Sequence, residues 1–415
     1  MKQERNCAQH RTRLAEIFQA ALASVEGAAA VAGWLRQHPP GGELRLVAVG
    51  KAAQSMADGA AQVLGERIRQ ALIITKFNHL DPMRCRRRGW EAIEAAHPVP
   101  DSNSLQAGQR LLDFLAEADE RPLLFLISGG ASSLVEAPVA GVTLDFLART
   151  NRWLLGSGLD IVQMNLVRKG LSRIKGGGLL AHLGGRQVYA LAISDVPGDR
   201  PDAIGSGLLV PEPDLADQLA GISLPEWLSE RLVAGLAQRS VPPSKVPKLQ
   251  IVANLRLARE AAARRARELG YAVYLHQEFT GGEAAETGRR LATELREGPP
   301  GVSIWGGETT VQLPPEPGQG GRNQHLALAA ATVLADNPDC YLLAAGTDGT
   351  DGPTEDAGAL VDGQTLQRAC VEGFDAERSL AAADAGRLLE ASGDLLTTGP
   401  TGTNVMDLMI GLKTA

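Results

Sequence analysis

The chain has 415 residues, 44% of them apolar and 4% aromatic, and it carries a formal net charge of -7 at pH 7. This length predicts two domains, and the negative charge argues against a general affinity for nucleic acid. The chain has no run of about 18 apolar residues, the length needed to span a bilayer. The four cysteines lack the spacing of a metal site or a disulfide framework, so we expect a cytoplasmic protein without a membrane partner.

The predicted elements begin with a helix over residues 4–38, where apolar side chains recur at helical spacing. Strand-like apolar runs follow at 44–49, 71–75, 123–127, 188–193, 249–253, 272–276, 302–305 and 340–345. Amphipathic helical stretches lie between many of these runs, at 104–118, 143–155, 256–269, 283–296 and 323–335. Apolar strands that alternate with helices predict parallel sheets covered on both faces, so the expected fold class is α/β and doubly wound. The proline-rich segment 239–248 is the predicted linker.

Glycine-containing loops with polar or charged side chains follow five of the predicted strands. They are GK (50–51), SGGASS (128–133), SDVPGD (194–199), GGETT (306–310) and GTDGTDGP (346–353). A further glycine-rich segment, GQGGRNQ (318–324), opens a predicted helix. Because ligands bind at the carboxyl ends of strands in doubly wound sheets, these loops predict a ligand site.

Two cations stand where a helix is expected to begin, Lys51 after a strand and Arg322 after two glycines. The helix dipole does not favour a positive charge there, so each predicts a bound anion such as a phosphate. In SGGASS, glycines let backbone N–H groups approach an anion, and Ser128, Ser132 and Ser133 can donate further hydrogen bonds. The alternative for this loop is an ordinary strand-to-helix turn.

Four aspartates, Asp195, Asp199, Asp348 and Asp351, lie in the loops after predicted strands. Carboxylates beside a phosphate-binding loop suit Mg²⁺, which prefers oxygen ligands and commonly bridges to substrate phosphates. One of them could instead be a general base on a hydroxyl group. The plain alternative is that aspartate in an Asp-Gly turn serves the turn itself.

Several common nucleotide-binding patterns are missing from the chain. It has no GxxxxGK[ST] segment, no GxGxxG after a strand and no protein-kinase signature set. The histidines show no HExxH or other ligand spacing, and only His97, in HPVPD, is a candidate to line a cleft. The absent fingerprint counts against a nicotinamide dinucleotide.

At these loops the sequence resembles the glycerate 2-kinase family, the two-domain type that has also carried the name hydroxypyruvate reductase. The matching segments are VGKAAQSM (49–56), HPVPD (97–101), SGGASSL (128–134), NLVRKGLSRIKGGGL (165–179), ISDVPGD (193–199), GGETTVQL (306–313), GGRNQHLAL (320–328), AAGTDGTDGPTEDAGA (344–359) and TTGPTGTNVMDL (397–408). They run in order over nearly the whole chain, which makes the resemblance highly specific.

The resemblance implies a large Rossmann-like N-terminal domain over residues 1–245 and a smaller α/β domain of the MOFRL type over 246–415, with the active site in the cleft between them. It implies ATP-dependent phosphorylation of D-glycerate at the 2-hydroxyl, with ATP and Mg²⁺ as cofactors and glycerate and ATP as small-molecule partners. The oligomeric state stays open, with a homodimer as one expectation.

The resemblance also implies roles for individual residues. We expect Lys51, Arg322 and Asp195 to be catalytic and Asp348 and Asp351 to bind the metal, although base and metal ligand can be exchanged among the three aspartates. Substrate or phosphate binding is expected of Ser128, Gly129, Gly130, Ser132, Ser133, Lys175, Gly321 and Asn323.

The sequence departs from the family pattern at three places. Ala131 replaces a glycine, His325 replaces an acidic residue, and SGLL (206–209) stands where SGPT is common. We expect these changes to bear on substrate selectivity more than on phosphoryl transfer. Two other functions remain as alternatives, an NAD(P)H-dependent hydroxypyruvate reductase and a catalytically silent metabolite-binding regulator.

Overall fold

The computed structural model describes residues 2–239 and 246–414 and divides the chain into two compact units. The N-terminal unit contains residues 27–252, and the C-terminal unit combines residues 1–26 with 253–415. The expected boundary near residue 245 therefore assigns the first 26 residues to the wrong unit, and most of the predicted linker 239–248 lies outside the described residues. No single helix of the described residues is long and apolar enough to cross a membrane, and one bent pair, 6–25 with 27–37, passes by length and composition only.

The N-terminal unit is built on a six-stranded sheet with the order β3-β2-β1-β4-β5-β6, and the pairs between β3 and β5 are all parallel. Its strands are β1 (Leu44–Val49), β2 (Ile68–Lys76), β3 (Glu91–Ala95), β4 (Leu123–Ile127), β5 (Val188–Ile193) and β6 (Leu249–Ala253). Its helices are α2 (Gly27–Gln37), α3 (Ala53–Leu64), α4 (Pro82–Arg88), α5 (Ser102–Ala116), α6 (Ala131–Leu134), α7 (Leu144–Gly156), α8 (Ile161–Gly170), α9 (Leu215–Ala220) and α10 (Glu226–Leu236). This arrangement confirms the doubly wound fold expected for the first half of the chain.

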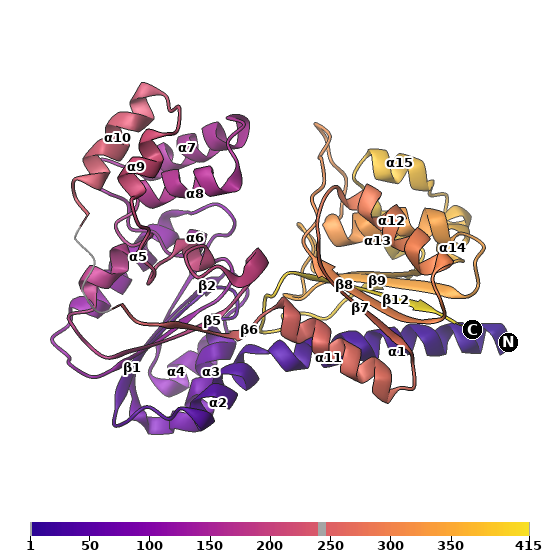
Figure 1. The fold of residues 1–415 in the computed structure, drawn as a ribbon, viewed down its shortest axis with the longest axis horizontal. Coiled ribbons are helices and arrows are strands. Elements are labelled where there is room, and N and C mark those ends of the chain that lie inside the picture. The colour runs from indigo at the N-terminus through magenta and orange to yellow at the C-terminus, as the bar shows by residue number, and fades with distance from the viewer. Residues whose placement is uncertain (1, 240–245, 415) are drawn as a thin grey trace. The chain divides into compact units, whose positions relative to one another are not determined.

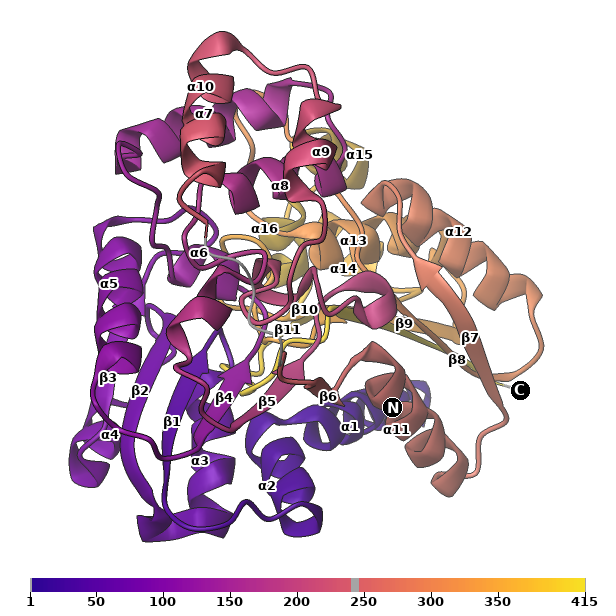
Figure 2. The ribbon, with the colours of Figure 1, turned by 60° about the vertical axis from the view of Figure 1, so that its left-hand side comes forward.

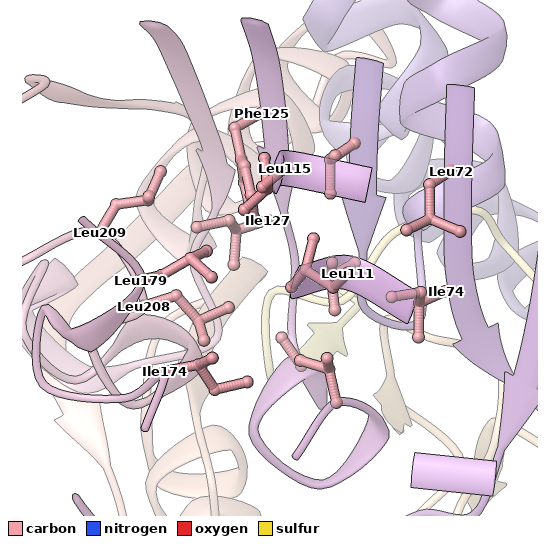
Figure 3. Packing of buried hydrophobic residues seen from close by; sticks show 14 of the residues in the cluster. Leu72, Ile74, Leu111, Leu115, Phe125, Ile127, Ile174, Leu179, Leu208 and Leu209 are labelled. Carbon is pink, nitrogen blue, oxygen red and sulfur yellow. The ribbon is translucent and has the colours of Figure 1, made fainter. Parts of the chain in front are cut away.

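Alternate residues of the central strands face opposite helices, as the period of two in a strand requires. Phe125 and Ile127 of β4 pack with Leu111 and Leu115 of α5 in one buried apolar cluster (Figure 3). The intervening β4 residues are equally buried and face α3, which contacts β1, β2 and β4. Burial on both sides explains why these strands appear in the sequence as continuous apolar runs.

A group of four helices, α7 to α10, forms a small second core within the N-terminal unit. Figures 1 and 2 show this group beyond the sheet, on the side where α6 lies. Helix α8 starts with a capping box in which Asp160 accepts from the Gln163 N–H, and α7 starts with Thr143 as its cap. Because α6 directly follows the loop after β4, the group lies on the side of the sheet where the predicted ligand loops of this unit leave their strands.

The C-terminal unit has a mixed sheet with the order β11-β10-β9-β12-β8-β7, in which only β7 and β8 pair in parallel. Its strands are β7 (Val273–Thr280), β8 (Gly301–Gly307), β9 (Cys340–Gly346), β10 (Gly358–Asp362), β11 (Leu395–Leu396) and β12 (Asp407–Lys413). Its helices are α1 (Lys2–Val25), α11 (Leu255–Glu268), α12 (Ala284–Glu297), α13 (Arg322–Leu334), α14 (Thr365–Val371), α15 (Ala376–Ala381) and α16 (Ala385–Ala391). The α/β class is confirmed, but the expectation of parallel sheets throughout was wrong for this unit.

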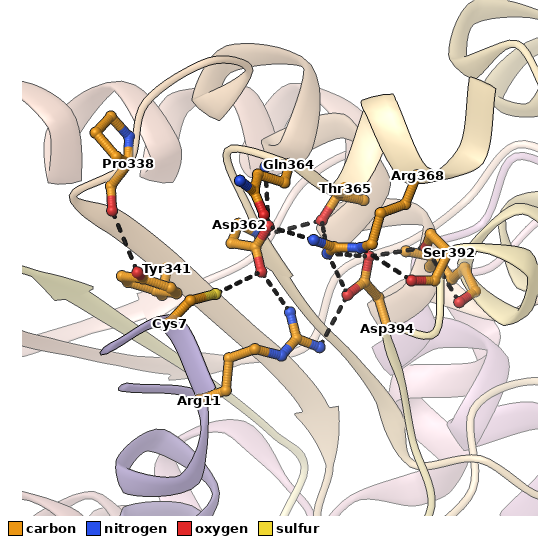
Figure 4. Close-up of polar contacts among 11 residues, drawn as sticks. Cys7, Arg11, Pro338, Tyr341, Asp362, Gln364, Thr365, Arg368, Ser392 and Asp394 are labelled. Atoms are coloured by element: carbon orange, nitrogen blue, oxygen red, sulfur yellow. Dashed lines mark hydrogen bonds and ion pairs between the residues drawn. The ribbon is translucent and has the colours of Figure 1, made fainter. Parts of the chain in front are cut away.

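Helix α1 belongs to the C-terminal unit because ion pairs and apolar contacts attach it there. Arg11 pairs with Asp362 at 2.7 Å and with Asp394 at 2.8 Å, and both carboxylates also bind Arg368 (Figure 4). The helix packs along α11 and against β9 and β12. Figure 1 shows α1 and α11 on one side of this sheet and α12 and α13 on the other. The predicted helix 4–38 is thus two helices, α1 and α2, each in a different unit.

Candidate active site

The strand order of the N-terminal unit reverses between β1 and β4, because the chain adds β2 and β3 on one side and β5 and β6 on the other. Such a reversal leaves a crevice at the carboxyl ends of the two central strands, which is where doubly wound sheets bind ligands. The loops that leave these strands are Gly50–Lys51 and Ser128–Gly130. The structure therefore brings the predicted lysine and the predicted glycine-serine loop to one place.

The two loops are held together by hydrogen bonds. The Lys51 N–H donates to the Gly129 carbonyl at 2.8 Å, and the Ala52 N–H donates to Ser128 Oγ at 3.0 Å. Gly50 has a φ of 128°, and a methyl group there would overlap both the side chain and the backbone of Ser128. Glycine is needed at this position because the loops approach so closely. Ser128, fully buried, thus fixes the loops rather than facing a ligand.

Gly130 marks the point where three loops meet. Its φ is 83°, and a Cβ at this position would lie 3.0 Å from His97 Cδ2 and 3.3 Å from Lys51 Cγ. His97 comes from the loop after β3, so the predicted cleft histidine does lie beside the lysine and the glycine-serine loop. The positive φ and the lack of space both favour glycine here.

A pocket of about 350 Å³ opens between these loops and helices α7 and α8. It is lined by His97, Pro98, Val99, Pro100, Gly130, Ser132, Ser133, Glu136, Leu147, Thr150, Asn151, Leu155, Arg168, Leu171 and Lys175. All of these residues belong to the N-terminal unit. Four of the residues expected to bind substrate or phosphate, Gly130, Ser132, Ser133 and Lys175, therefore line one pocket.

The pocket serines differ in their partners. Ser132 Oγ lies 2.7 Å from Ser206 Oγ, and Ser133 Oγ donates to the Gly130 carbonyl at 3.2 Å. Ser206 belongs to the SGLL segment, one of the departures from the family pattern. A hydroxyl pair of this kind can turn one oxygen toward a ligand while the other keeps the hydrogen bond.

Lys175 lies in the pocket wall as half of a buried ion pair. Its ammonium group contacts the Glu136 carboxylate, which also accepts from Ser172 Oγ at 2.6 Å. Both side chains are less than a twentieth exposed. The neighbouring Lys169 is paired in the same way, with Glu212 at 2.5 Å. The charge of the predicted ligand residue Lys175 is therefore balanced within the protein.

Asp195 follows β5, the strand next to β4, and so lies at the same edge of the sheet as Lys51. The turn that carries it is fixed by Ser194, whose buried Oγ accepts from the Val196 N–H at 3.3 Å. Asp195 itself is half-buried. Asp199, four residues further on, has a φ of 54° and is part of a short helical turn.

Arg322 begins α13 in the C-terminal unit, and its charge is met by carboxylates of the protein. Its Nε and Nη2 bind Asp407 at 2.6 and 3.0 Å, and its Nη1 binds Glu308 at 2.8 Å. Although burial works against the charge, Asp407 and Glu308 raise the pKa of Arg322. Because Asp407 and Glu308 already supply negative charge, the position of Arg322 at a helix start does not by itself indicate a bound anion, and its expected ligand contact stays a prediction.

Asp351 caps α13, the helix that Arg322 opens. It accepts from the Asn323 N–H at 3.1 Å and from the Gln324 N–H at 2.8 Å, and a methyl group at Gly321 would overlap it. It is 2% exposed, and burial raises its pKa to about 7 despite those hydrogen bonds. The predicted residues Gly321, Asn323 and Asp351 thus form one helix start, in which both carboxylate oxygens are engaged.

Asp348 lies at the end of β9 and is 8% exposed. Its Oδ1 accepts from the Thr350 N–H at 3.1 Å and from the Thr350 hydroxyl at 3.2 Å. A Cβ at Gly346 would lie 3.3 Å from this oxygen and 3.5 Å from Asp407 Oδ1, so the two carboxylates share a neighbourhood. Within the described residues, no group of three or more His, Cys, Asp or Glu side chains is arranged to hold a metal ion.

Comparison with known proteins covers nearly the whole chain. Residues 13–231 match a family described as a domain of unknown function, DUF4147, and residues 301–407 match the MOFRL family. The D-glycerate 2-kinase of Thermotoga maritima is 39% identical over 88% of this chain and 90% of its own length. The chain belongs to the glycerate 2-kinase family. A glycerate 2-kinase of Pyrococcus horikoshii is 35% identical over 90% of this chain and 88% of its own length.

A solved structure of the family is also similar to this one. The crystal structure of glycerate kinase from Thermotoga maritima superimposes with a TM-score of 0.85 at 37% identity, covering 98% of this chain and all of that one. A relative from Agrobacterium vitis, 36% identical over 95% of this chain and 92% of its own length, has a name that records hydroxypyruvate reductase as an unproven activity. Relatives named as glycerate kinases match this chain both with higher and with lower identity than this Agrobacterium protein does.

Sequence reasoning missed four polar residues of the pocket, Glu136, Thr150, Asn151 and Arg168, of which Thr150 and Asn151 belong to α7 and Arg168 to α8. Arg168 lies within the segment NLVRKGLSRIKGGGL, so the family resemblance contained it without drawing attention to it. Helix α8 was not among the predicted helices, and without it the pocket has no second wall.

Proposed function

We propose that this chain is a glycerate 2-kinase, which transfers the γ-phosphoryl group of ATP to the 2-hydroxyl of D-glycerate and releases ADP and 2-phospho-D-glycerate. The carrying observation is the joined pair of loops at the switch point between β1 and β4, with Lys51 and His97 both beside Gly130. Membership of a family whose curated relatives bear this activity in their names supports the same reaction.

In the proposed mechanism, Lys51 lies against the transferred phosphoryl group and stabilises the charge that develops on its oxygens. The loop Gly129–Ser133 supplies backbone N–H and hydroxyl donors for substrate oxygens. Asp195 orients the 2-hydroxyl of glycerate and accepts its proton as the new O–P bond forms and the bond to the β-phosphate oxygen of ATP breaks. Asp195 remains the leading candidate for this base because it follows β5, the strand next to β4, at the same edge of the sheet as Lys51.

We propose that the loops of the C-terminal unit serve this same reaction, with Arg322 and Asp348 as the residues that act. Mg²⁺ would enter as part of the MgATP substrate, because Mg²⁺ commonly needs only one or two carboxylates beside phosphate oxygens. Asp348 suits that role better than Asp351, whose two oxygens already accept hydrogen bonds from the start of α13. Asp351, Gly321 and Asn323 then act by placing Arg322.

The reductase alternative finds no support in the first turn after β1. A dinucleotide pyrophosphate needs a second glycine there, where the chain has KAAQS at 51–55. We also propose a cytoplasmic location, since all four cysteines are free, Cys7, Cys85, Cys340 and Cys370. A homodimer stays a prediction.

The deciding experiment records phosphorus NMR spectra of the pure protein with ATP, Mg²⁺ and D-glycerate over time. A parallel sample contains NADH and hydroxypyruvate, and its NADH absorbance is monitored. The proposal expects 2-phosphoglycerate without 3-phosphoglycerate and without NADH loss. A 3-phosphoglycerate signal would keep the kinase but reject the 2-hydroxyl. Oxidation of NADH without a phosphorylated product would reject the kinase.

A further inference from the structure

Arg168 of α8 faces the pocket with a charge that the described residues do not balance. Its Nε donates to Asn151 Oδ1 at 3.2 Å and its Nη1 donates to Asn165 Oδ1 at 3.2 Å. Both partners are neutral amides, and none of the carboxylates in residues 6–239 and 246–414 forms an ion pair with this guanidinium. A guanidinium has five N–H donors, so its Nη2 group keeps donors that no described residue accepts.

The neighbouring lysines show that this is unusual for the segment. Lys169 is paired with Glu212 in a partly buried ion pair, and Lys175 is paired with Glu136 in a buried one. Arg168 is half-buried, and this burial lowers the pKa of its guanidinium without an opposing carboxylate. Burying a charge without a counter-charge is costly, and the cost is offset when a ligand brings the opposite charge.

The rest of the pocket suggests what that ligand is. The lining combines Gly130, Ser132 and Ser133 of the switch-point loop with Arg168 and Asn151 of the helical group, and Leu147 and Leu171 add apolar surface. The volume of about 350 Å³ suits a small molecule. A polyphosphate would need several unbalanced cations in this pocket, whereas the single fork of one arginine matches a carboxylate.

We propose that Arg168, oriented by Asn151 and Asn165, binds the carboxylate of the hydroxy-acid substrate and so selects acids over neutral polyols. This rests on the proposed function, in which the acceptor is D-glycerate. Binding the carboxylate at α8 leaves the hydroxyl groups of the acid toward Ser132 and the switch-point loop, where phosphoryl transfer is expected. Arg168 would therefore determine both which acceptor binds and how it is turned.

The test compares Arg168→Gln, which removes the charge and keeps amide donors, with Arg152→Gln as a matched control. Arg152 is exposed, lies on α7 and does not line the pocket. We expect Arg168→Gln to raise the KM for D-glycerate roughly 10- to 100-fold, the size expected for a charge-assisted pair. The KM for ATP should stay within about twofold, and Arg152→Gln should change neither constant.

A neutral substrate analogue sharpens the assignment. Wild-type protein should prefer D-glycerate over D-glyceramide, in which the carboxylate is an amide, and Arg168→Gln should lose most of that preference. If Arg168→Gln instead raises the KM for ATP and leaves the glycerate KM unchanged, the site binds phosphate and the inference is wrong. An unchanged preference for glycerate over glyceramide would also overturn it.

Failure of the proposed function can be told apart from failure of this inference. Calorimetric titration of D-glycerate and D-glyceramide into the wild-type and Arg168→Gln proteins needs no ATP and no turnover. A wild-type protein that makes no 2-phosphoglycerate but binds D-glycerate through Arg168 would reject the kinase and keep the carboxylate site. A variant with a normal circular dichroism spectrum and wild-type affinity for D-glycerate would reject the site. If Arg168→Gln does not fold, Arg168→Lys replaces it, because lysine keeps the charge and loses the two-pronged guanidinium. Its affinity for D-glycerate should also fall, and wild-type affinity in that variant would reject the site.

Discussion

Replacing Arg322 by alanine should destabilise the C-terminal unit by about 3 kcal/mol, because it leaves Asp407 as a buried carboxylate without its cation. Asp407 is fully buried and receives two hydrogen bonds from the guanidinium. Removal of one partner of a buried pair usually costs about 3–5 kcal/mol. We expect the lower end, since Arg322 is itself 37% exposed and partly solvated.

The structure offers a matched comparison on the same guanidinium. Glu308 binds Arg322 at 2.8 Å but is 41% exposed, so Glu308→Gln should cost no more than about 1 kcal/mol. The double variant Arg322→Ala with Asp407→Asn removes the stranded charge as well, and it should recover most of the stability that Arg322→Ala loses.

Hydrogen exchange read by mass spectrometry can measure these effects unit by unit. Amides of α13 and β12 should exchange roughly 100-fold faster in Arg322→Ala, while amides of β1 and β4 in the N-terminal unit serve as the internal reference. Equal effects of Arg322→Ala and Glu308→Gln would refute the reasoning. Turnover of the double variant then separates two roles: a stable but inactive protein assigns Arg322 to catalysis, and a stable, active one assigns it to structure alone.

Three further predictions follow from single positions. Gly130→Ala should lower the free energy of unfolding by about 1–2 kcal/mol because of its φ of 83°, and should lower turnover because the methyl group would crowd His97 and Lys51. Gly89, with a φ of 66° and open space around it, is the control. Gly89→Ala should lose a similar free energy of unfolding in chemical denaturation and leave turnover unchanged. Lys51→Ala should lower kcat by roughly 100-fold or more in the coupled ADP assay, and retained turnover would remove it from the mechanism. Burial raises the pKa of Asp351 from 3.8 to about 7 in the folded protein, so its contribution to stability is greatest below pH 4 and is lost as the pH rises to about 7. The free energy of unfolding from chemical denaturation should fall by at most about 4 kcal/mol across this range because of this group. Asp351→Asn should flatten that slope.

The strands whose ends carry the switch-point loops could be predicted closely from the sequence. The runs at 44–49, 123–127 and 188–193 coincide with β1, β4 and β5, because strands buried on both faces are continuous apolar runs. Strand β3, with the sequence EAIEA, was missed because it lies at the edge of its sheet and carries two glutamates. The central strand β12 was missed although it is buried, since its short apolar run contains Gly411 and gives no periodic signal.

The residues that meet at the site were harder to predict than the elements. Helix α1 lies in the C-terminal unit through Arg11, whose partners Asp362 and Asp394 are more than 350 residues away in the chain. The pocket required α8, a short helix whose apolar Ile161 and Val162 are exposed and therefore blur its helical pattern, and which precedes a glycine-rich stretch. Pairing of this kind depends on the completed fold, and single-sequence patterns contain no signal for it.

A cation beside a glycine-rich loop is ambiguous in sequence, because its counter-ion can be a ligand or a distant carboxylate. Arg322 finds Asp407, 85 residues along the chain, and Lys175 finds Glu136, 39 residues back, so neither charge by itself indicates a ligand. Arg168 has only the amides of Asn151 and Asn165 in the described part of the chain. The folded structure thus turns a list of candidate cations into a ranking, in which the charge left unbalanced inside a pocket is the one that most needs a substrate anion. On this ranking we propose that Arg168 of α8, a helix outside the sheet, recognises the acid, and that the switch-point loops bind the phosphoryl group.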